Sequence, residues 1–219
     1  MAKTHGALIN NFTEGNVAKQ LFAFSMPLFL SNLLQVVYNM VDMMVVGRAM
    51  GQVGLSAVAI GGDITNFFTF LSIGFSNAGQ VIIAQYIGAQ KPDKVGQFIG
   101  TMTSFLLSIA MVLTILGVVF RQQLLILMHT PPECMEEALA YAVTCILGMV
   151  FIYGYNIVGG ILRGMGDAKH PFYFISFAAV LNIVLDLVFV FNLQLGAFGA
   201  ALGTIISQGF SFCFGVYFL

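Results

Sequence analysis

The sequence has very few charged residues, and this scarcity argues against both a nucleic-acid-binding protein and a soluble domain. Only 8% of its 219 residues are charged, and the formal net charge is −1. A near-neutral chain has no electrostatic footprint for nucleic acid, so we expect no nucleic-acid partner. Hydrophobic residues make up 59% of the chain and the mean hydropathy is +0.95, values outside the usual range of a soluble domain. The sequence therefore predicts an integral membrane protein surrounded by membrane lipid.

Cysteine and histidine are also scarce. The three cysteines, Cys134, Cys145 and Cys213, have unrelated spacings, so we expect neither a disulfide framework nor a metal site and interpret them as small buried hydrophobic residues. The three histidines stand apart from any cluster of ligands, and we expect no metal role for them. No early apolar stretch ends in a small-residue cleavage site, so we expect no removable signal peptide. We expect neither an enzyme nor an organic cofactor.

Long apolar runs are what the chain has in abundance, and six of them are long enough for helices that cross a membrane. They lie at about 17–47, 55–88, 95–120, 138–162, 171–192 and 195–219, after an N-terminal arm at 1–16. We thus predict an all-α integral membrane protein with a bundle of six transmembrane helices. The N-terminal arm and the connections on its side hold six Lys and Arg residues, against two on the other side. This bias predicts a multi-pass protein of the cell inner (plasma) membrane with a cytoplasmic N-terminus.

One carboxylate, Asp42, stands inside the first apolar run. It is the only formal charge in residues 22–46. An acid in hydrocarbon is costly unless it is paired, hydrated, bound to a cation or protonated, so it usually marks a pathway for ions or protons. Asn32, Gln35 and Asn39 precede it at spacings of three and four residues, which puts four polar side chains on one stripe of a helix.

A second intramembrane acid, Asp186, is predicted to lie at the same depth as Asp42. Each acid precedes the outer end of its run by five or six residues, or about 8 to 9 Å. Asn182 shares a helical face with Asp186, and Thr204 on the sixth run returns to the same level. Two carboxylates, an amide and a hydroxyl are oxygen ligands suited to Na+, and two close carboxylates can also share one proton. The sequence therefore predicts a site for Na+ or H+ but does not choose between them.

Each of these residues also has a structural alternative. A lone intramembrane Asn or Thr more often joins helices than binds an ion, whereas two acids at matched depth favour a function. Asp63 lies near the outer end of a run longer than a bilayer needs, so we interpret it as an interfacial residue. The Gly-rich segment at 196–203 is sufficiently explained by close helix packing.

Five segments of the chain resemble the multidrug and toxic compound extrusion (MATE) transporters. They are PLFLSNLLQVVYNMVDMMVVGRAMG (27–51), AQYIGAQKPDK (84–94), ILRGMGDAKHP (161–171), NIVLDLVFVF (182–191) and GAFGAALGT (196–204). Each segment alone is loose, but their order and spacing together are specific. The acids of the first and fifth helices are similar to those of the prokaryotic branch called DinF-like.

The resemblance implies cation-coupled antiport of organic compounds, commonly cationic and amphipathic, out of the cell in exchange for Na+ or H+. It implies that the cation or proton site is formed by Asp42, Asn182, Asp186 and Thr204. It also implies a substrate cavity lined by Gln35, Tyr38, Tyr141 and Asn156. Family members have two six-helix halves, so the 219 residues correspond to the N-terminal lobe and the C-terminal lobe is absent. The implied partners are small organic substrates and a second six-helix lobe, from the same full-length chain or a second copy.

Three alternatives stay open. Gly164, Gly166 and Asp167 fit the GxGD signature of intramembrane aspartyl proteases, but Asp167 falls in a cytoplasmic connection that we interpret as a solvated hairpin turn. A lipid-linked saccharide flippase of the same superfamily would need Arg or Lys within the lobe to bind phosphate, and no basic residue falls within an apolar run. A chain of half length would also suit a role in assembly alone.

Overall fold

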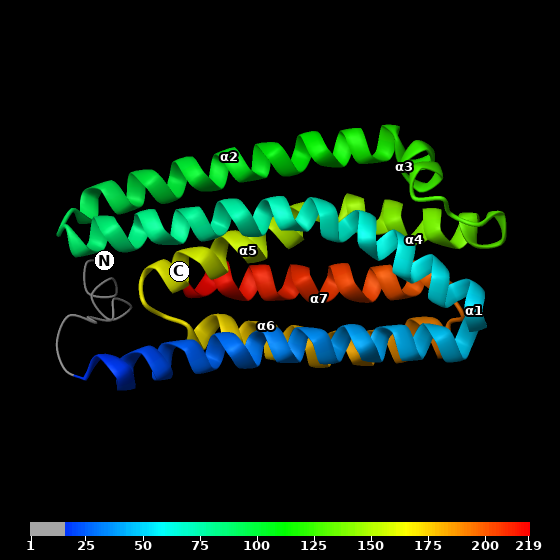
Figure 1. The fold of residues 1–219 in the computed structure, drawn as a ribbon, viewed down its shortest axis with the longest axis horizontal. Helices are drawn as coiled ribbons and strands as arrows, with labels where there is room; N and C mark the ends of the chain where they lie inside the picture. Colours follow the sequence, from blue (N-terminus) through cyan, green and yellow to red (C-terminus); the bar gives the residue numbers. More distant parts are fainter. Residues whose placement is uncertain (1–15) are drawn as a thin grey trace.

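The structure is a computed structural model that describes residues 16–219. Every regular element in this range is helical (Figure 1). Most of the predicted N-terminal arm lies outside the described residues. Among the described helices, four are long and apolar enough to cross a membrane, or five when one bent pair is counted as a span. The longest of them, α1, folds back on itself. The chain is therefore a multi-pass membrane protein built as a helical bundle.

Helix α1 (Val17–Gly88) is a hairpin of two arms. As a straight helix its 72 residues would extend about 108 Å, more than three times the thickness of the hydrocarbon core. Gly51 alone within it has non-helical angles, with φ 67° and ψ −149°. The chain reverses at this residue, so that the first arm (17–50) and the second arm (52–88) run in opposite directions (Figure 1). The connection expected at about 48–54 is thus one residue, because glycine adopts these backbone angles readily.

Helix α2 (Pro92–Val119) follows a short turn in which Gln90 has a φ of 55°. Its N-terminal proline suits the first turn of a helix, where a backbone N–H has no partner inside the helix. The region expected as a connection after residue 120 contains two short elements, α3 (Arg121–Leu127) and the 3₁₀ turn η2 (Pro132–Cys134). These elements turn the chain back at one end of the bundle (Figure 1).

The expected span at 138–162 is two helices, α4 (Met135–Leu147) and α5 (Met149–Gly164), bent by 50° at the break. Gly148 lies at the break, with φ −82° and ψ 2°. A Cβ atom on this glycine would collide with the side chain of Ile205 on α7. The bend therefore follows from tertiary packing, which the apolar run does not encode.

Helix α6 (Lys169–Asp186) begins two residues before the expected run at 171–192. Asp167 caps it by accepting hydrogen bonds from the backbone N–H groups of Lys169 (3.0 Å) and His170 (3.2 Å). The helix continues into a π-helical turn, η3 (Leu187–Asn192). Helix α7 (Gly196–Phe218) then returns through the bundle.

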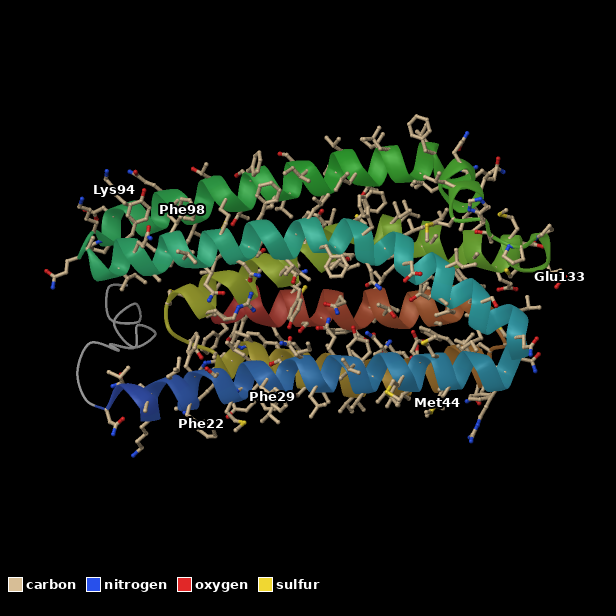
Figure 2. The ribbon with its side chains drawn as sticks, viewed as in Figure 1. Phe22, Phe29, Met44, Lys94, Phe98 and Glu133 are labelled. Atoms are coloured by element: carbon tan, nitrogen blue, oxygen red, sulfur yellow. The ribbon has the colours of Figure 1, made fainter. Side chains whose placement is uncertain are left out.

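The bundle surrounds α7, which contacts α1, α4, α5 and α6 (Figure 1). Its core is apolar: Leu106 and Tyr153 have no exposed surface, and the Tyr153 hydroxyl donates a 2.9 Å hydrogen bond to the carbonyl of Phe68. The outer surface is apolar too. Phe29 and Met44, labelled in Figure 2, are 62% and 59% exposed on the first arm, as expected of side chains that face lipid.

Candidate functional site

A polar cavity of about 680 Å³ lies inside the bundle. Both arms of α1 line it, together with residues of α4, α5, α6 and α7. Figure 2 shows side chains of these helices gathered between the two arms. Polar groups at membrane depth are stable only when they face protein, water or a ligand. The cavity is therefore the place where the polar residues of this apolar chain have partners.

The polar stripe of the first arm faces this cavity. Asn32, Gln35, Asn39 and Asp42 all line it, and so does Tyr38 beside them. Side chains three and four residues apart share one side of a helix, so all residues of the stripe face inward together. Asp42 itself is buried, with 6% of its surface exposed.

Asn182 connects the predicted ion-site residues of α6 and α7. Its amide nitrogen Nδ2 lies 3.4 Å from Asp186 Oδ1 and 3.4 Å from Thr204 Oγ1. Asp186 has no exposed surface and Asn182 only 2%. Asp42 and Thr204 line the cavity, whereas Asn182 and Asp186 lie behind its wall. The structure thus brings the α6 and α7 residues into one buried cluster next to the cavity.

Three buried oxygens of the predicted set have no hydrogen-bond partner: Asp42 Oδ1, Asn182 Oδ1 and Asp186 Oδ2. Asp42 and Asp186 lie on helices that contact each other, α1 and α6. Unpartnered buried oxygens are costly, and a proton or a hard cation removes that cost. The donor set consists of oxygens alone, so its chemistry suits Na+ or H+ rather than a soft metal.

Two features of the backbone lie next to Asp186: a glycine that faces it and a π-helical turn that follows it. Gly203 on α7 faces it, and a Cβ atom at that position would lie 2.5 Å from Asp186 Oδ1. The π-helical turn η3 starts at the residue after Asp186, and such turns are frequent at functional sites. The Gly-rich segment interpreted as a packing motif therefore packs directly against the candidate site.

The residues predicted to form the substrate cavity all line this one: Gln35, Tyr38, Tyr141 and Asn156. Tyr38 and Gln35 on the first arm and Gln208 on α7 line the same cavity. Polar side chains of the first arm and of α7 therefore share one cavity wall.

A second polar stripe, on the other arm of α1, was missed by the sequence analysis. It lines the cavity with Asp63, Asn66, Thr69, Asn77 and Gln80. Asp63 was interpreted as interfacial, but it is exposed to this cavity. The signal was present in the sequence, because these residues recur at helical spacing, as the residues of the first stripe do.

A basic residue also lines the cavity. Arg163 was expected in a cytoplasmic connection, but it lies in the last turn of α5 and reaches the cavity. The expectation of a lobe without basic residues is therefore wrong at this position. The apolar run ends at residue 162, so the run alone placed Arg163 just outside the helix.

The interpretation of Asp167 as a solvated turn residue is also wrong. Asp167 is 6% exposed, caps α6 and pairs with the ring of His170. Its carboxylate is thus engaged in starting a helix, and it is not among the residues that line the cavity. The protease alternative, which requires this acid to face a second one, loses its main residue.

The cysteines are free thiols, and two of the three match their interpretation. Cys134 and Cys145 are buried, whereas Cys213 is exposed on α7. Within residues 16–219, no three His, Cys, Asp or Glu side chains converge as a metal site.

The fold and the cavity define a class: a multi-pass membrane protein whose helical bundle holds a buried group of carboxylate, amide and hydroxyl oxygens. The family follows from comparison with known proteins. The family model described as MatE matches residues 27–188, which is more than half of the chain. The chain therefore belongs to the MATE family of multidrug transporters.

Known members agree with this assignment. The chain is 34% identical over 209 residues to "Probable multidrug resistance protein YpnP" of Bacillus subtilis (strain 168), covering 95% of this chain and 47% of the relative. It is 25% identical over 190 residues to "DNA damage-inducible protein F" of Escherichia coli (strain K12), covering 87% and 41%. The solved structure titled "Crystal structure of MATE in the bent conformation" aligns with a TM-score of 0.88 at 28% identity, covering 94% and 46%. The chain thus spans a little less than half the length of these relatives.

Proposed function

We propose that the chain acts as the N-terminal half of a cation-coupled antiporter that exports organic, cationic and amphipathic compounds. In this proposal Asp42, Asn182, Asp186 and Thr204 bind the coupling ion, Na+ or H+, and the cavity beside them binds the compound. The observation that carries the proposal is the set of three buried oxygens without hydrogen-bond partners, on Asp42, Asn182 and Asp186. These atoms are ready to receive a positive ion.

Competition between the coupling ion and the organic cation for the same negative charge would couple entry of the ion to export of the compound. An ion or proton bound at Asp42 and Asp186 neutralises charge in the cavity wall, so an organic cation is then held less strongly. Release of the ion restores the charge and the attraction. Each elementary charge that crosses the whole membrane contributes about 2.3 kcal/mol per 100 mV, which can drive export against a gradient when the coupling is tight.

The proposal includes a location and partners. The chain lies in the cell inner (plasma) membrane with its N-terminus in the cytoplasm, as the distribution of Lys and Arg predicts. A second six-helix lobe, from the same full-length chain or a second copy, supplies the other side of the substrate pathway. Transporters built from repeated units place their sites between those units, which supports this arrangement.

The first test is cation binding by the purified chain in nanodiscs. We expect saturable binding of radioactive sodium, or a proton that is released as pH rises, and we expect Asp42→Asn and Asp186→Asn to weaken that binding at least tenfold. Asp93→Asn is the matched control, because this acid is exposed in the first turn of α2, outside the cavity. Wild-type binding by both site variants would refute the ion site.

The second test follows transport. Cells that contain the chain together with a second lobe are loaded with ethidium, a fluorescent cation, and the sodium and pH gradients are collapsed one at a time. We expect efflux to stop with one gradient only, which identifies the coupling ion. Efflux that survives the loss of both gradients contradicts cation-coupled antiport.

The runner-up function is a lipid-linked saccharide flippase of the same superfamily. One observation favours it: Arg163 lines the cavity and is able to bind a phosphate. Asp42 and Asp63 line the same cavity and repel an anion. Cation export is therefore the better supported function.

A further inference from the structure

The guanidinium of Arg163 points into the bundle instead of out toward solvent. Arg163 lies in the last turn of α5, is half-buried and lines the cavity. Its side chain folds back along its own helix, so that a Cβ atom on Gly159, one turn earlier, would lie 2.9 Å from Arg163 Nη1. Glycine at position 159 therefore leaves the space that the guanidinium occupies.

The position of this side chain is fixed from the second arm of α1. Arg163 Nε donates a 3.0 Å hydrogen bond to Gln80 Oε1. The helices that carry the two residues are in close contact, because a Cβ on Gly160 would lie 2.9 Å from the carbonyl oxygen of Ser76. The guanidinium is thus held at Nε, and its outer nitrogens Nη1 and Nη2 form no hydrogen bond or ion pair with residues 16–219.

No carboxylate of the described residues neutralises Arg163. Asp167, the acid nearest in sequence, is paired with His170 and the start of α6. Asp63 lies on the same arm as Gln80 but 17 residues earlier, about 25 Å along the helix. Asp42 belongs to the ion site, nearer the turn at Gly51. The cavity therefore has acids toward one end and a half-buried, unpaired cation toward the other.

We propose that Arg163, held by Gln80, forms an oxyanion subsite of the cavity, which binds a carboxylate or phosphate group of the carried compound. A guanidinium held at Nε presents its two outer nitrogens as a fork that matches the two oxygens of such a group. Asn77 and Tyr155 line the same cavity and add polar surface. The inference rests on the proposed function for the role of the cavity, and it extends the carried compounds to zwitterionic ones.

The test measures binding of nitrobenzoxadiazole-aminohexanoate, a fluorescent carboxylate, to the chain in phosphatidylcholine nanodiscs, with its methyl ester as the neutral probe and empty nanodiscs subtracted. Arg163→Gln should bind the carboxylate about ten- to a hundredfold more weakly, since charge-assisted hydrogen bonds are lost, and should bind the ester as the wild type does. Arg163→Lys keeps the charge and should recover part of the affinity. Lys169→Gln is the matched control, because it removes an exposed cation from α6, outside the cavity.

Three results would overturn the subsite: unchanged carboxylate affinity in Arg163→Gln, equal losses for the carboxylate and the ester, or an equal loss in Lys169→Gln. A further arm adds phosphatidylglycerol to the nanodiscs. Displacement of the probe by this lipid in the wild type, but not in Arg163→Gln, would identify a lipid headgroup as a source of the oxyanion and would support the subsite. The measurement uses no ion gradient, so its failure leaves cation binding at Asp42 and Asp186 as a separate question.

Discussion

At the scale of single residues, Asp186 shows how closely the candidate ion site is packed. It has no exposed surface, accepts one weak hydrogen bond from Asn182, and has an oxygen with no partner. The facing residue, Gly203, has no side chain that would displace the carboxylate. The candidate site therefore depends on the room that Gly203 leaves for the Asp186 carboxylate, as well as on the charge of that carboxylate.

We predict that Gly203→Ala weakens cation binding about tenfold. The new Cβ would lie 2.5 Å from Asp186 Oδ1, and relief of such overpacking typically costs about 1–3 kcal/mol through movement of the neighbour. Gly209→Ala on the same helix is the control, because its Cβ would meet Phe151 at an ordinary 3.6 Å. Sodium binding or proton release in nanodiscs measures both variants. Wild-type affinity in Gly203→Ala would mean that the position of the Asp186 carboxylate does not matter for binding.

Residues of the site differ in how far the sequence predicts them. Asp42 and Asp186 stand out because a charge within an apolar run has few explanations. Asp63 shows the limit of this reasoning, since its depth depends on where the chain turns, and the turn is a single residue. Arg163 lies beyond the end of its apolar run, and only the packing of α5 against α1 shows that its side chain turns inward.

At the scale of elements, the hairpin of α1 depends on the backbone of one residue. Gly51 has a φ of 67°, and a Cβ atom at this position would meet no atom within 4 Å. Any effect of a side chain there is therefore conformational strain rather than a clash.

We predict that Gly51→Ala lowers the free energy of unfolding by about 1–3 kcal/mol, because an L-residue other than glycine is strained in this region. Gly74→Ala isolates the cause. A Cβ at Gly74 also meets nothing within 4 Å, but this glycine is inside the helical second arm, where alanine stabilises by up to about 1 kcal/mol. Reversible unfolding in mixed micelles, followed by circular dichroism, measures both. Equal effects of the two substitutions would contradict the strain at Gly51.

The elements themselves follow from the sequence more directly than their ends and bends do. The length of their apolar runs predicts α2, α6 and α7, because a helix pairs all backbone N–H and C=O groups of a single segment in lipid. The bend at Gly148 and the π-helical turn η3 arise from contacts between helices, which no local pattern of hydropathy records. Helix α3 is too short for the apolar signal that identifies a span.

At the scale of the whole molecule, the proposed orientation places Lys94 and Glu133 on opposite sides of the membrane. The two residues lie at opposite ends of the bundle (Figure 2). We predict that Glu133→Cys, in a chain whose native cysteines are replaced by serine, reacts with a membrane-impermeant maleimide in intact cells. Lys94→Cys should react only after the cells are permeabilised. The reverse pattern would mean that the N-terminus is on the outer side.

The correspondence with one lobe of a larger transporter was predicted from the order of five short segments, and the family match and the 0.88 TM-score over 46% of a MATE structure agree with it. Hydropathy alone does not reach this conclusion, since any six apolar runs predict a six-helix bundle. The cavity was implied by the stripe on the first arm. The polar residues of the opposite wall also recur at helical spacing, but that they face the first stripe follows only from the turn at Gly51.

The turn at Gly51 has a mechanical consequence. A single glycine separates two helical arms of more than 30 residues each, so its two torsion angles set the opening between the polar stripe of the first arm and that of the second. A swing of about 5° at that pivot displaces the far tip of a 45 Å rod by about 4 Å. A small local torsion is thus converted into a displacement wider than a water molecule, at the end of the molecule that carries Arg163.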